Sequence, residues 1–373
     1  MCALMERLLV LGAGAGQLGL LAAARARGLF VIAVDRDPRA PGFQFADRRA
    51  IVSVDDEPIV ERLAEAERVD GVIAPGADWP VGAAARIASK LGLPHPILPE
   101  TAVLSASKLR QRERLAEAGI PQTRWQVVSR ADEAVQVPCL VRPPDHQGRR
   151  ARALVRSSRE LRGAVRAALR ASRIGLCLVE ELAEQPVVTV TAFSREGVFH
   201  PLVVTDRAPL AHVWESAHVD LAAALAGRAA EALGVCEGPT ITQIGIGKEG
   251  PLVLELAARI GGGHEAELCD ASLGIDLHGL ALAAALGKEI PAKRLRPKHR
   301  TGGACVRFLS GQGEPDGLAR AQAVPGVAWA RVYGGSERAG AVLAVGASRD
   351  EALERATRSA ECIRFSAADA HAV

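Results

Sequence analysis

The residues with the clearest chemical potential lie in the segment Thr240–His264, which reads TITQIGIGKEGPLVLELAARIGGGH. Apolar residues alternate on either side of a turn at 248–250, and this period-two pattern predicts a β-hairpin. If the hairpin is symmetric about Glu249, Gln243 lies directly opposite Glu255, with the two Cβ atoms roughly 5 Å apart. An amide oxygen and a carboxylate at this separation suit Mg²⁺, which prefers oxygen ligands. The segment therefore predicts a metal site on one face of a hairpin.

The same alternation predicts which side chains of the hairpin are buried. The residues expected to face the core are Ile244, Ile246, Leu252, Leu254 and Leu256. The residues expected on the opposite face are Gln243, Val253, Glu255 and Ala257, with Arg259 added if the strand continues. The glycines at 261–263 then leave backbone N–H groups free to face an anion. Taken alone, the charged residues also fit a solvated strand edge, so the rest of the chain must decide between the two interpretations.

The composition limits the classes of protein to which this chain can belong. Its 373 residues, 49% hydrophobic and 24% charged, are typical of a multidomain globular protein. A net charge of +3 without a run of like charge, and only 3% aromatic residues, argue against a nucleic-acid or membrane partner. The seven cysteines form no CxxC pair, so they predict reduced thiols in a cytoplasmic protein and no zinc ribbon.

The first third of the chain predicts an α/β domain with a parallel sheet. The apolar run Leu8–Leu11 reads as a strand, the glycine-rich turn Gly12–Gly19 follows it, and a helix then leads to a second strand at Phe30–Val34, closed by Asp35. This unit resembles a dinucleotide-binding fingerprint. Glycines also serve simply to bring a helix close to a strand, and that interpretation is favoured here.

The middle of the chain collects the elements of a triphosphate site. A helix opens at Lys108, a strand ends at Arg142, and the polar loop Pro143–Arg150 follows it. A later strand ends in the acidic pair Glu180-Glu181. A cation can hold phosphates, a loop can cover them, and the acidic strand end can meet an adenine edge. Each residue alone also fits a surface role, and it is their order along the chain that favours the site.

These motifs together resemble those of the ATP-grasp ligases, over nearly the whole chain. SKLRQRERLAEAGIP is similar to the helix that opens the grasp, and CLVRPPDHQG to the phosphate-contacting strand and loop. LVEELAEQP is similar to the hinge that binds adenine, and PLVLELAARIGGGH to the motif that serves metal and phosphoryl transfer. Arg142 and Gln243 are the choices of carbamoyl-phosphate synthetase-like members at positions where Lys and Glu are commoner.

The resemblance implies a multidomain protein of α/β and α+β class. Residues 1–106 would form a Rossmann-like domain that precedes the grasp. Residues 107–290 would form the ATP-grasp fold of two α+β lobes, with about 122–182 as a mobile lid. Residues 291–373 would form a C-terminal α+β module that closes the site or makes a homodimer surface.

The resemblance also implies roles for individual residues. The residues expected at ATP are Lys108, Arg142, Gln147, Gly148, Glu180, Glu181 and Leu182, with Lys108 and Arg142 on phosphates and Glu180 at the adenine amino group. The metal ligands would be Gln243 and Glu255, and the catalytic residues Glu255 and Arg259, where Arg259 stabilises the transferring phosphoryl group. The residues expected at the substrates are Arg207, Glu215, His218, Gly262, Gly263 and His264. For His218, a packing or capping role ahead of the next helix is the competing interpretation.

The activity implied is that of an ADP-forming carboxylate–amine ligase. Such an enzyme would use ATP and Mg²⁺ or Mn²⁺ to convert a small carboxylate, such as an amino acid, into an acyl phosphate that an amine then attacks. Two departures motivate an alternative, a nucleotide-binding relative without catalysis: Ala257 stands where the family has a metal-binding Asn, and Val187 where it has a ribose-binding Glu. A third interpretation, a nicotinamide oxidoreductase, rests on the segment Gly12–Gly19 and on Asp35.

Overall fold

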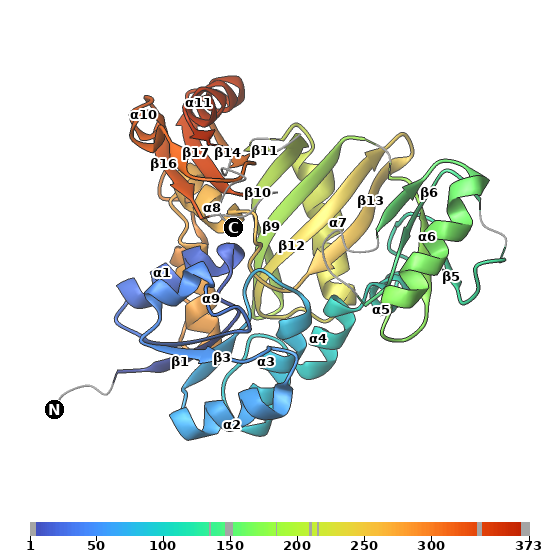
Figure 1. Cartoon of the computed structure of the whole chain (residues 1–373), viewed down its shortest axis with the longest axis horizontal. Coiled ribbons are helices and arrows are strands. Elements are labelled where there is room, and N and C mark those ends of the chain that lie inside the picture. The colour runs from blue at the N-terminus through green and yellow to red at the C-terminus, as the bar shows by residue number, and fades with distance from the viewer. Residues whose placement is uncertain are drawn as a thin grey trace, which may run out of the picture.

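The computed structural model describes residues 5–133, 136–145, 152–183, 185–208, 211–214, 216–333 and 338–366 (Figure 1). Within these ranges the chain forms a four-stranded parallel sheet, a four-stranded antiparallel sheet and an eight-stranded antiparallel sheet, with a small two-stranded pairing near its end. The predicted mixed α/β and α+β fold class is therefore confirmed. None of the helices in the described ranges has the length and apolar character needed to cross a membrane.

The parallel sheet lies at the N-terminus and has the order β3-β2-β1-β4. Its strands are β1 (Arg7–Leu11), β2 (Phe30–Asp35), β3 (Arg48–Ile51) and β4 (Gly71–Ile73). Helices α1 (Leu18–Ala26), α2 (Glu57–Glu67), α3 (Trp79–Lys90) and α4 (Pro99–Ala106) belong to the same part of the chain. The central strands are continuous apolar runs because both faces of the sheet are covered. Asp35 accepts a hydrogen bond from the Ala13 amide at 2.8 Å, so this carboxylate braces the glycine turn.

A smaller lobe follows helix α5 (Lys108–Glu117). Its sheet has the order β5-β8-β6-β7, from β5 (Trp125–Val128), β6 (Cys139–Arg142), β7 (Ala153–Val155) and β8 (Cys177–Glu181). The amphipathic helix α6 (Ser158–Ala171) packs against this sheet through Val165 and Ala168, which join Val141 and Val179 in a separate small core (Figure 1). The lobe therefore has a core of its own.

The large sheet has the order β13-β12-β9-β10-β11-β14-β17-β16. Its strands are β9 (Val187–Arg195), β10 (Val198–Ala208), β11 (Ala211–Trp214), β12 (Gly238–Gly247), β13 (Gly250–Ala257), β14 (Gly303–Leu309), β16 (Val327–Val332) and β17 (Gly340–Gly346). The helices that follow or flank these strands are α7 (Val219–Ala232), α8 (Glu265–Leu273), α9 (Leu277–Ala285), α10 (Leu318–Gln322) and α11 (Arg349–Glu361). The short strands β15 (Pro315–Asp316) and β18 (Arg364–Phe365) pair with each other. Because β14, β17 and β16 continue the large sheet, the tail shares its hydrogen bonds, and the division at 290/291 stays a prediction.

Two hydrophobic cores join the N-terminal sheet to the large sheet. Leu8 of β1 belongs to one core, together with Leu280 of α9. Leu9, the next residue of β1, belongs to the other core, together with Ile244 and Val253 of the hairpin β12–β13. Successive side chains of one strand point to opposite faces, so a single strand anchors both cores. The parts of the chain that carry the site are thus packed into one unit.

A substitution at Gly71 can test how closely the N-terminal sheet packs against α9. Gly71 of β4 is buried, and a Cβ atom there would lie 2.5 Å from the Ala285 carbonyl oxygen of α9. We expect Gly71→Ala to lower the free energy of unfolding by about 1–3 kcal/mol, because backbone must move to admit the methyl group. Gly163, exposed inside α6 with nothing near its Cβ position, is the control.

For Gly163→Ala we expect the opposite sign, a gain of about 1 kcal/mol from helix propensity. Urea denaturation followed by circular dichroism measures both variants. Equal effects of the two substitutions would contradict the close packing of β4 against α9.

Candidate active site

The hairpin β12–β13 places the two predicted metal ligands side by side. The strands are antiparallel, the turn lies at Lys248-Glu249, and Gln243 is the register partner of Glu255. This pairing confirms the predicted pair, whereas the symmetry about Glu249 from which it was predicted is wrong, because Ile246 pairs with Pro251 next to the turn. Both side chains line one cavity of about 570 Å³.

A bulge in β13 makes part of the burial prediction wrong. Ile244 pairs with Val253, so Leu254 has no register partner between Val253 and Glu255. Val253 is therefore fully buried, whereas Leu252 and Leu254, predicted to face the core, are only partly buried. Strict period-two counting fails here because an extra residue reverses the faces of everything beyond it. The bulge lets β13 bury Val253 while Glu255 faces the cavity.

A buried arginine holds this bulge. Arg112 of α5 donates to the carbonyl oxygens of Val253 and Leu254 at 2.8 and 2.7 Å, and only 3% of its surface is exposed. Gln111, its neighbour, exchanges hydrogen bonds with the amide and carbonyl of Leu256 at 2.8 and 2.7 Å. The sequence analysis missed both residues. Their spacing from Lys108, i+3 and i+4 on one helix face, is the signal that would have found them.

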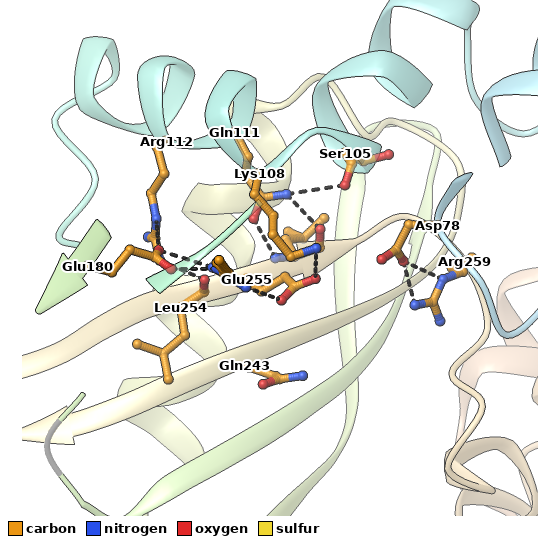
Figure 2. Close-up of polar contacts among 12 residues, drawn as sticks. Asp78, Ser105, Lys108, Gln111, Arg112, Glu180, Gln243, Leu254, Glu255 and Arg259 are labelled. Carbon is orange, nitrogen blue, oxygen red and sulfur yellow. Dashed lines mark hydrogen bonds and ion pairs between the residues drawn. The ribbon is translucent and has the colours of Figure 1, made fainter. Parts of the chain in front are cut away.

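The Glu255 carboxylate lies between two cations from different elements. Lys108 Nζ is 3.1 Å from Oε1, and Arg142 Nη1 is 3.2 Å from Oε2. Figure 2 shows Lys108 reaching this carboxylate from α5, with Gln243 on the neighbouring strand. Burial by itself would raise the pKa of Glu255, but Lys108 and Arg142 outweigh it and hold the pKa below its ordinary value. The carboxylate is therefore ionised and available as an oxygen ligand.

Glu180 lies on the other side of Arg142. Its Oε2 accepts from Arg142 Nε at 2.5 Å and its Oε1 from Arg112 Nε at 2.8 Å, and only 2% of Glu180 is exposed. Burial favours the neutral acid, yet Arg142 and Arg112 together lower the pKa of this carboxyl. Because both oxygens already have guanidinium partners, the role of Glu180 at an adenine amino group stays a prediction.

The 570 Å³ cavity collects most of the predicted site residues. Those that line it are Lys108, Arg142, Arg207, Gln243, Glu255, Arg259, Gly262, Gly263 and His264. The glycine turn of the N-terminal sheet supplies part of the wall through Ala15, Gly16 and Gln17. Among the described lining residues, the basic side chains Lys108, Arg142, Arg152, Arg207, Arg259 and Arg338 outnumber the acidic Asp78, Glu255 and Glu265. The cavity therefore favours an anionic ligand.

Arg259 reaches the cavity by a route that the sequence analysis did not foresee. Strand β13 ends at Ala257, so Arg259 does not lie on a continued strand as expected. Its Nε instead donates to Asp78 Oδ1 at 2.5 Å, and Figure 2 shows this pair beside the Lys108–Glu255 contact. Asp78 was not predicted, although a carboxyl end of a parallel strand, here β4, is where α/β sheets place ligand-binding residues.

The glycine run after β13 serves close packing as well as backbone exposure. A Cβ atom on Gly262 would lie 3.3 Å from the Gly76 carbonyl oxygen, and one on Gly16 would lie 3.4 Å from Gly262 Cα. The Gly263 amide donates to Glu265 Oε2 at 2.8 Å, so the expectation that this N–H is free to face an anion is wrong. The loops that follow strands of the N-terminal sheet and the loop that follows the hairpin are therefore in contact, and glycines allow their backbones to lie this close.

A second cavity, of about 310 Å³, lies at the predicted hinge. Its lining includes Glu180, Glu181 and Leu182, with apolar contributions from Val137 and Val179. Glu181 forms an exposed ion pair with Arg124 at 2.8 Å. A cavity with both polar and apolar lining beside the backbone of a strand end is the kind of site that accepts a flat heterocycle.

The remaining predicted residues fall in three groups. Gln147, Gly148 and Glu215 lie outside the described residues. His218 is the residue before α7, makes no side-chain capping bond there, and is absent from the described lining of the large cavity. Ala257 is buried and pairs with Ile241, which lines the cavity, and Val187 is the first residue of β9. Within the described ranges no three His, Cys, Asp or Glu side chains gather as a metal site.

The sequence was compared with protein-family models and with curated proteins. No family model matches the chain. The sequence is 28% identical to the formate-dependent phosphoribosylglycinamide formyltransferase of Burkholderia pseudomallei, with 94% of each chain covered. It is 26% identical to the uncharacterized protein y4rH of Sinorhizobium fredii, covering 91% of this chain and 78% of that protein.

Solved structures decide the fold. The L-amino acid ligase from Bacillus licheniformis matches with a TM-score of 0.82 at 18% identity, covering 97% of this chain and 99% of that one. The chain has the ATP-grasp fold. Another ATP-grasp structure, N5-carboxyaminoimidazole ribonucleotide synthetase from Thermotoga maritima, matches with a TM-score of 0.77 at 21% identity, covering 96% and 99%. The biotin carboxylase domain from Hydrogenobacter thermophilus, solved with Mg-ADP and bicarbonate, matches with a TM-score of 0.77 at 16% identity, covering 97% and 90%.

The buried carboxylates predict how the stability of this protein changes with pH. The folded-state pKa values of Glu180 and Glu255 lie below the ordinary value because of their cationic partners. Their contribution to stability is therefore complete above the unfolded-state pKa of about 4.3 and is lost as the pH falls toward the folded-state values. We expect the urea midpoint to fall steeply below about pH 5.

Glu180→Gln removes one of these carboxylates, so the urea midpoint of the variant should fall less steeply below about pH 5. The variant should also be less stable at neutral pH, because Arg142 and Arg112 lose their charged partner. Glu249→Gln, an exposed residue at the hairpin turn, is the matched control and should follow the wild-type curve. Urea titrations over this pH range measure all three proteins. An unchanged acid limb in Glu180→Gln would contradict the assignment.

Proposed function

We propose that this chain is an ATP-dependent, ADP-forming ligase that activates a small carboxylate as an acyl phosphate and joins it to an amine. The observation that carries the proposal is the Glu255 carboxylate, held by Lys108 and Arg142 and paired in register with Gln243. Arg259 lines the same basic cavity. Phosphoryl transfer is driven mainly by positioning and by neutralising charge, which is what this set of groups provides.

The donor set fits Mg²⁺ or Mn²⁺ together with a nucleotide. Mg²⁺ is commonly bound by one or two carboxylates plus phosphate oxygens and water, so one carboxylate and one amide suffice even with Ala257 in place of a third ligand. Gln243 Oε1 now accepts from Arg207 Nη1 at 2.7 Å, so that oxygen is already oriented toward cations. When bound, the metal ion would supply charge neutralisation for the transferring phosphoryl group.

The chain's own residues would bind and orient ATP. Lys108 and Arg142, which the Glu255 carboxylate now neutralises, would contact phosphate oxygens, since guanidinium and ammonium groups bind both kinds of anion. The hinge cavity beside Glu181 and Leu182 would take the adenine ring. Arg259, held beside the cavity by Asp78, would stabilise the charge that develops on the phosphoryl group.

The carboxylate substrate is proposed to be an amino acid, and the product an amide or peptide-like bond. The similarity to the L-amino acid ligase supports this choice. The relatives named formate-dependent formyltransferase favour formate as the second candidate, because formate is also a small carboxylate that reacts with an amine. The basic groups Arg207 and Arg338 at the cavity suit either carboxylate.

The decisive experiment follows ADP, phosphate and condensation products by mass spectrometry. Purified protein is incubated with ATP and Mg²⁺, with pools of amino acids or formate as the carboxylate, and with amines. We expect ADP release only when a carboxylate is present. Nucleotide binding with no turnover in any pool would favour a binding protein without catalysis, as the Ala257 and Val187 departures suggest. Binding of reduced dinucleotide in place of ATP would favour the oxidoreductase.

Two substitutions test the site itself. Glu255→Gln removes the charge of the metal ligand, and Arg259→Met removes the guanidinium, so each should lower substrate-dependent ADP formation at least about 100-fold. Glu249→Gln, at the exposed turn of the same hairpin, is the control and should keep wild-type activity. Circular dichroism verifies the fold of each variant. Retained activity in both Glu255→Gln and Arg259→Met would contradict the site assignment.

A further inference from the structure

A chain of three hydrogen-bonded side chains reaches the wall of the large cavity. Tyr333 Oη lies 2.7 Å from His264 Nε2, and His264 Nδ1 lies 3.0 Å from Glu267 Oε1. Tyr333 and His264 both line the cavity, whereas Glu267 lies behind them in the first turn of α8. Tyr333, directly after β16, is the only tyrosine in the chain. The phosphate-binding groups described above take no part in this arrangement.

The charge of Glu267 fixes the direction of these hydrogen bonds. Burial would raise the pKa of Glu267, but the hydrogen bond from His264 and the charges nearby lower it to about 2. An ionised carboxylate only accepts, so His264 Nδ1 carries a proton, and in the neutral form of the ring Nε2 is left as an acceptor. Tyr333 therefore donates its hydroxyl proton to Nε2, and the oxygen lone pairs of Tyr333 remain for a ligand in the cavity.

The groups packed around His264 hold the ring in place. Trp329 contacts it edge-on with the ring centroids 5.0 Å apart, and Phe308 of β14 lies at 6.3 Å. The charged groups that face this cluster are Arg331, whose Nη1 is 3.9 Å from Glu267 Oε1, His278 of α9 at 4.0 Å from Glu267 Oε2, and Arg338, stacked on Phe308 at 4.4 Å. Burial lowers the pKa of His278, which favours its neutral form.

The proposed reaction requires a proton acceptor at this place. An amino-acid amine is mostly ammonium at neutral pH, with an ordinary α-amino pKa of about 8, and ammonium has no lone pair to attack an acyl phosphate. Among the described acidic side chains of the cavity, Asp78 is paired with Arg259, Glu255 is neutralised by Lys108 and Arg142, and Glu265 accepts from the Gly263 amide. The Tyr333 hydroxyl instead is hydrogen-bonded to a histidine nitrogen, His264 Nε2, which can take up its proton.

We propose that Tyr333, His264 and Glu267 form a proton relay that deprotonates the amine substrate; this role rests on the proposed ligase activity. The ammonium proton passes to Tyr333 Oη while the hydroxyl proton of Tyr333 passes to His264 Nε2. Glu267 stabilises the imidazolium so formed. The amine lone pair then attacks the acyl carbon and the C–N bond forms. The C–O bond to phosphate breaks, and the departing phosphate takes the second N–H proton and leaves as hydrogen phosphate. The imidazolium returns its proton to water, so the relay ends as it began.

Two further observations agree with a relay through a neutral phenol. Burial raises the pKa of Tyr333, so the hydroxyl keeps its proton until it can pass one on in exchange. His264 has a φ of 63°, in the left-handed region, at the residue before α8. A non-glycine residue there is uncommon and is typical of a site where the surrounding structure over-determines the backbone.

Hydroxylamine separates the relay from the rest of the reaction. It is a neutral nucleophile at neutral pH and attacks acyl phosphates without needing to lose a proton first. Tyr333→Phe keeps the ring but removes the hydroxyl. We expect kcat for amide formation to fall about 100-fold or more in Tyr333→Phe, the usual contribution of general base catalysis. Hydroxamate formation from ATP, carboxylate and hydroxylamine should stay within about twofold of wild type.

His264→Asn provides the second variant, because Asn tolerates the left-handed backbone that this position requires. It should show the same split between amide and hydroxamate. The exposed His299→Asn is the control and should behave as wild type in both assays.

The outcomes distinguish the two proposals. If the wild type forms neither ADP nor hydroxamate with any carboxylate, the ligase assignment fails and the relay with it. If the wild type is active and Tyr333→Phe forms amide at the wild-type rate, the relay alone is overturned. Equal loss of hydroxamate and amide in Tyr333→Phe would show that Tyr333 only shapes the cavity, which also overturns the relay.

Discussion

The rest of the site depends on one buried interaction, the Glu255 carboxylate between Lys108 and Arg142. Three elements meet there: the hairpin, the helix α5 and the small lobe that carries β6. Arg142 also binds Glu180, and Glu180 binds Arg112, which holds the bulge of β13. Opposite charges therefore alternate from the lobe to the hairpin, and no member of the series is buried without a partner. A ligand with phosphate groups would enter this series by competing with a carboxylate for its cations.

Contact between loops is the second constraint on the cavity. Three glycines make this contact: Gly16 and Gly76 follow strands of the N-terminal sheet, and Gly262 lies in the segment after β13. Their backbones lie so close together that a side chain at any of them would press against a neighbouring residue. The cavity wall is therefore shared between the N-terminal sheet and the ATP-grasp fold. The glycine turn that resembles a dinucleotide fingerprint is part of this wall.

Local patterns predicted much of the architecture, and long-range contacts explain what they missed. Alternation and turn chemistry located the hairpin, because these signals depend on nearby residues. The predicted pairing of Gln243 with Glu255 is correct, although it depends on the bulge, which shifts the register by one residue beyond Ile244 and Val253. The bulge at Leu254 escaped prediction, since its stabilising partner Arg112 lies on a helix far away in the chain. Asp78 and Tyr333 escaped for the same reason: each sits alone in its own segment, and only folding brings it to Arg259 or His264.

The order of strands in the large sheet has a consequence for how the protein folds during its synthesis. Strand β13, which carries Glu255, and strand β16, which Tyr333 directly follows, are the two edge strands of the sheet, yet Glu255 and Tyr333 line the same cavity. Synthesis proceeds from the N-terminus, so a chain still on the ribosome contains the strand with Glu255 long before the strand that ends next to Tyr333. An unfinished chain would therefore hold the cations without the opposite wall, and the cavity closes only when the last strands join the sheet.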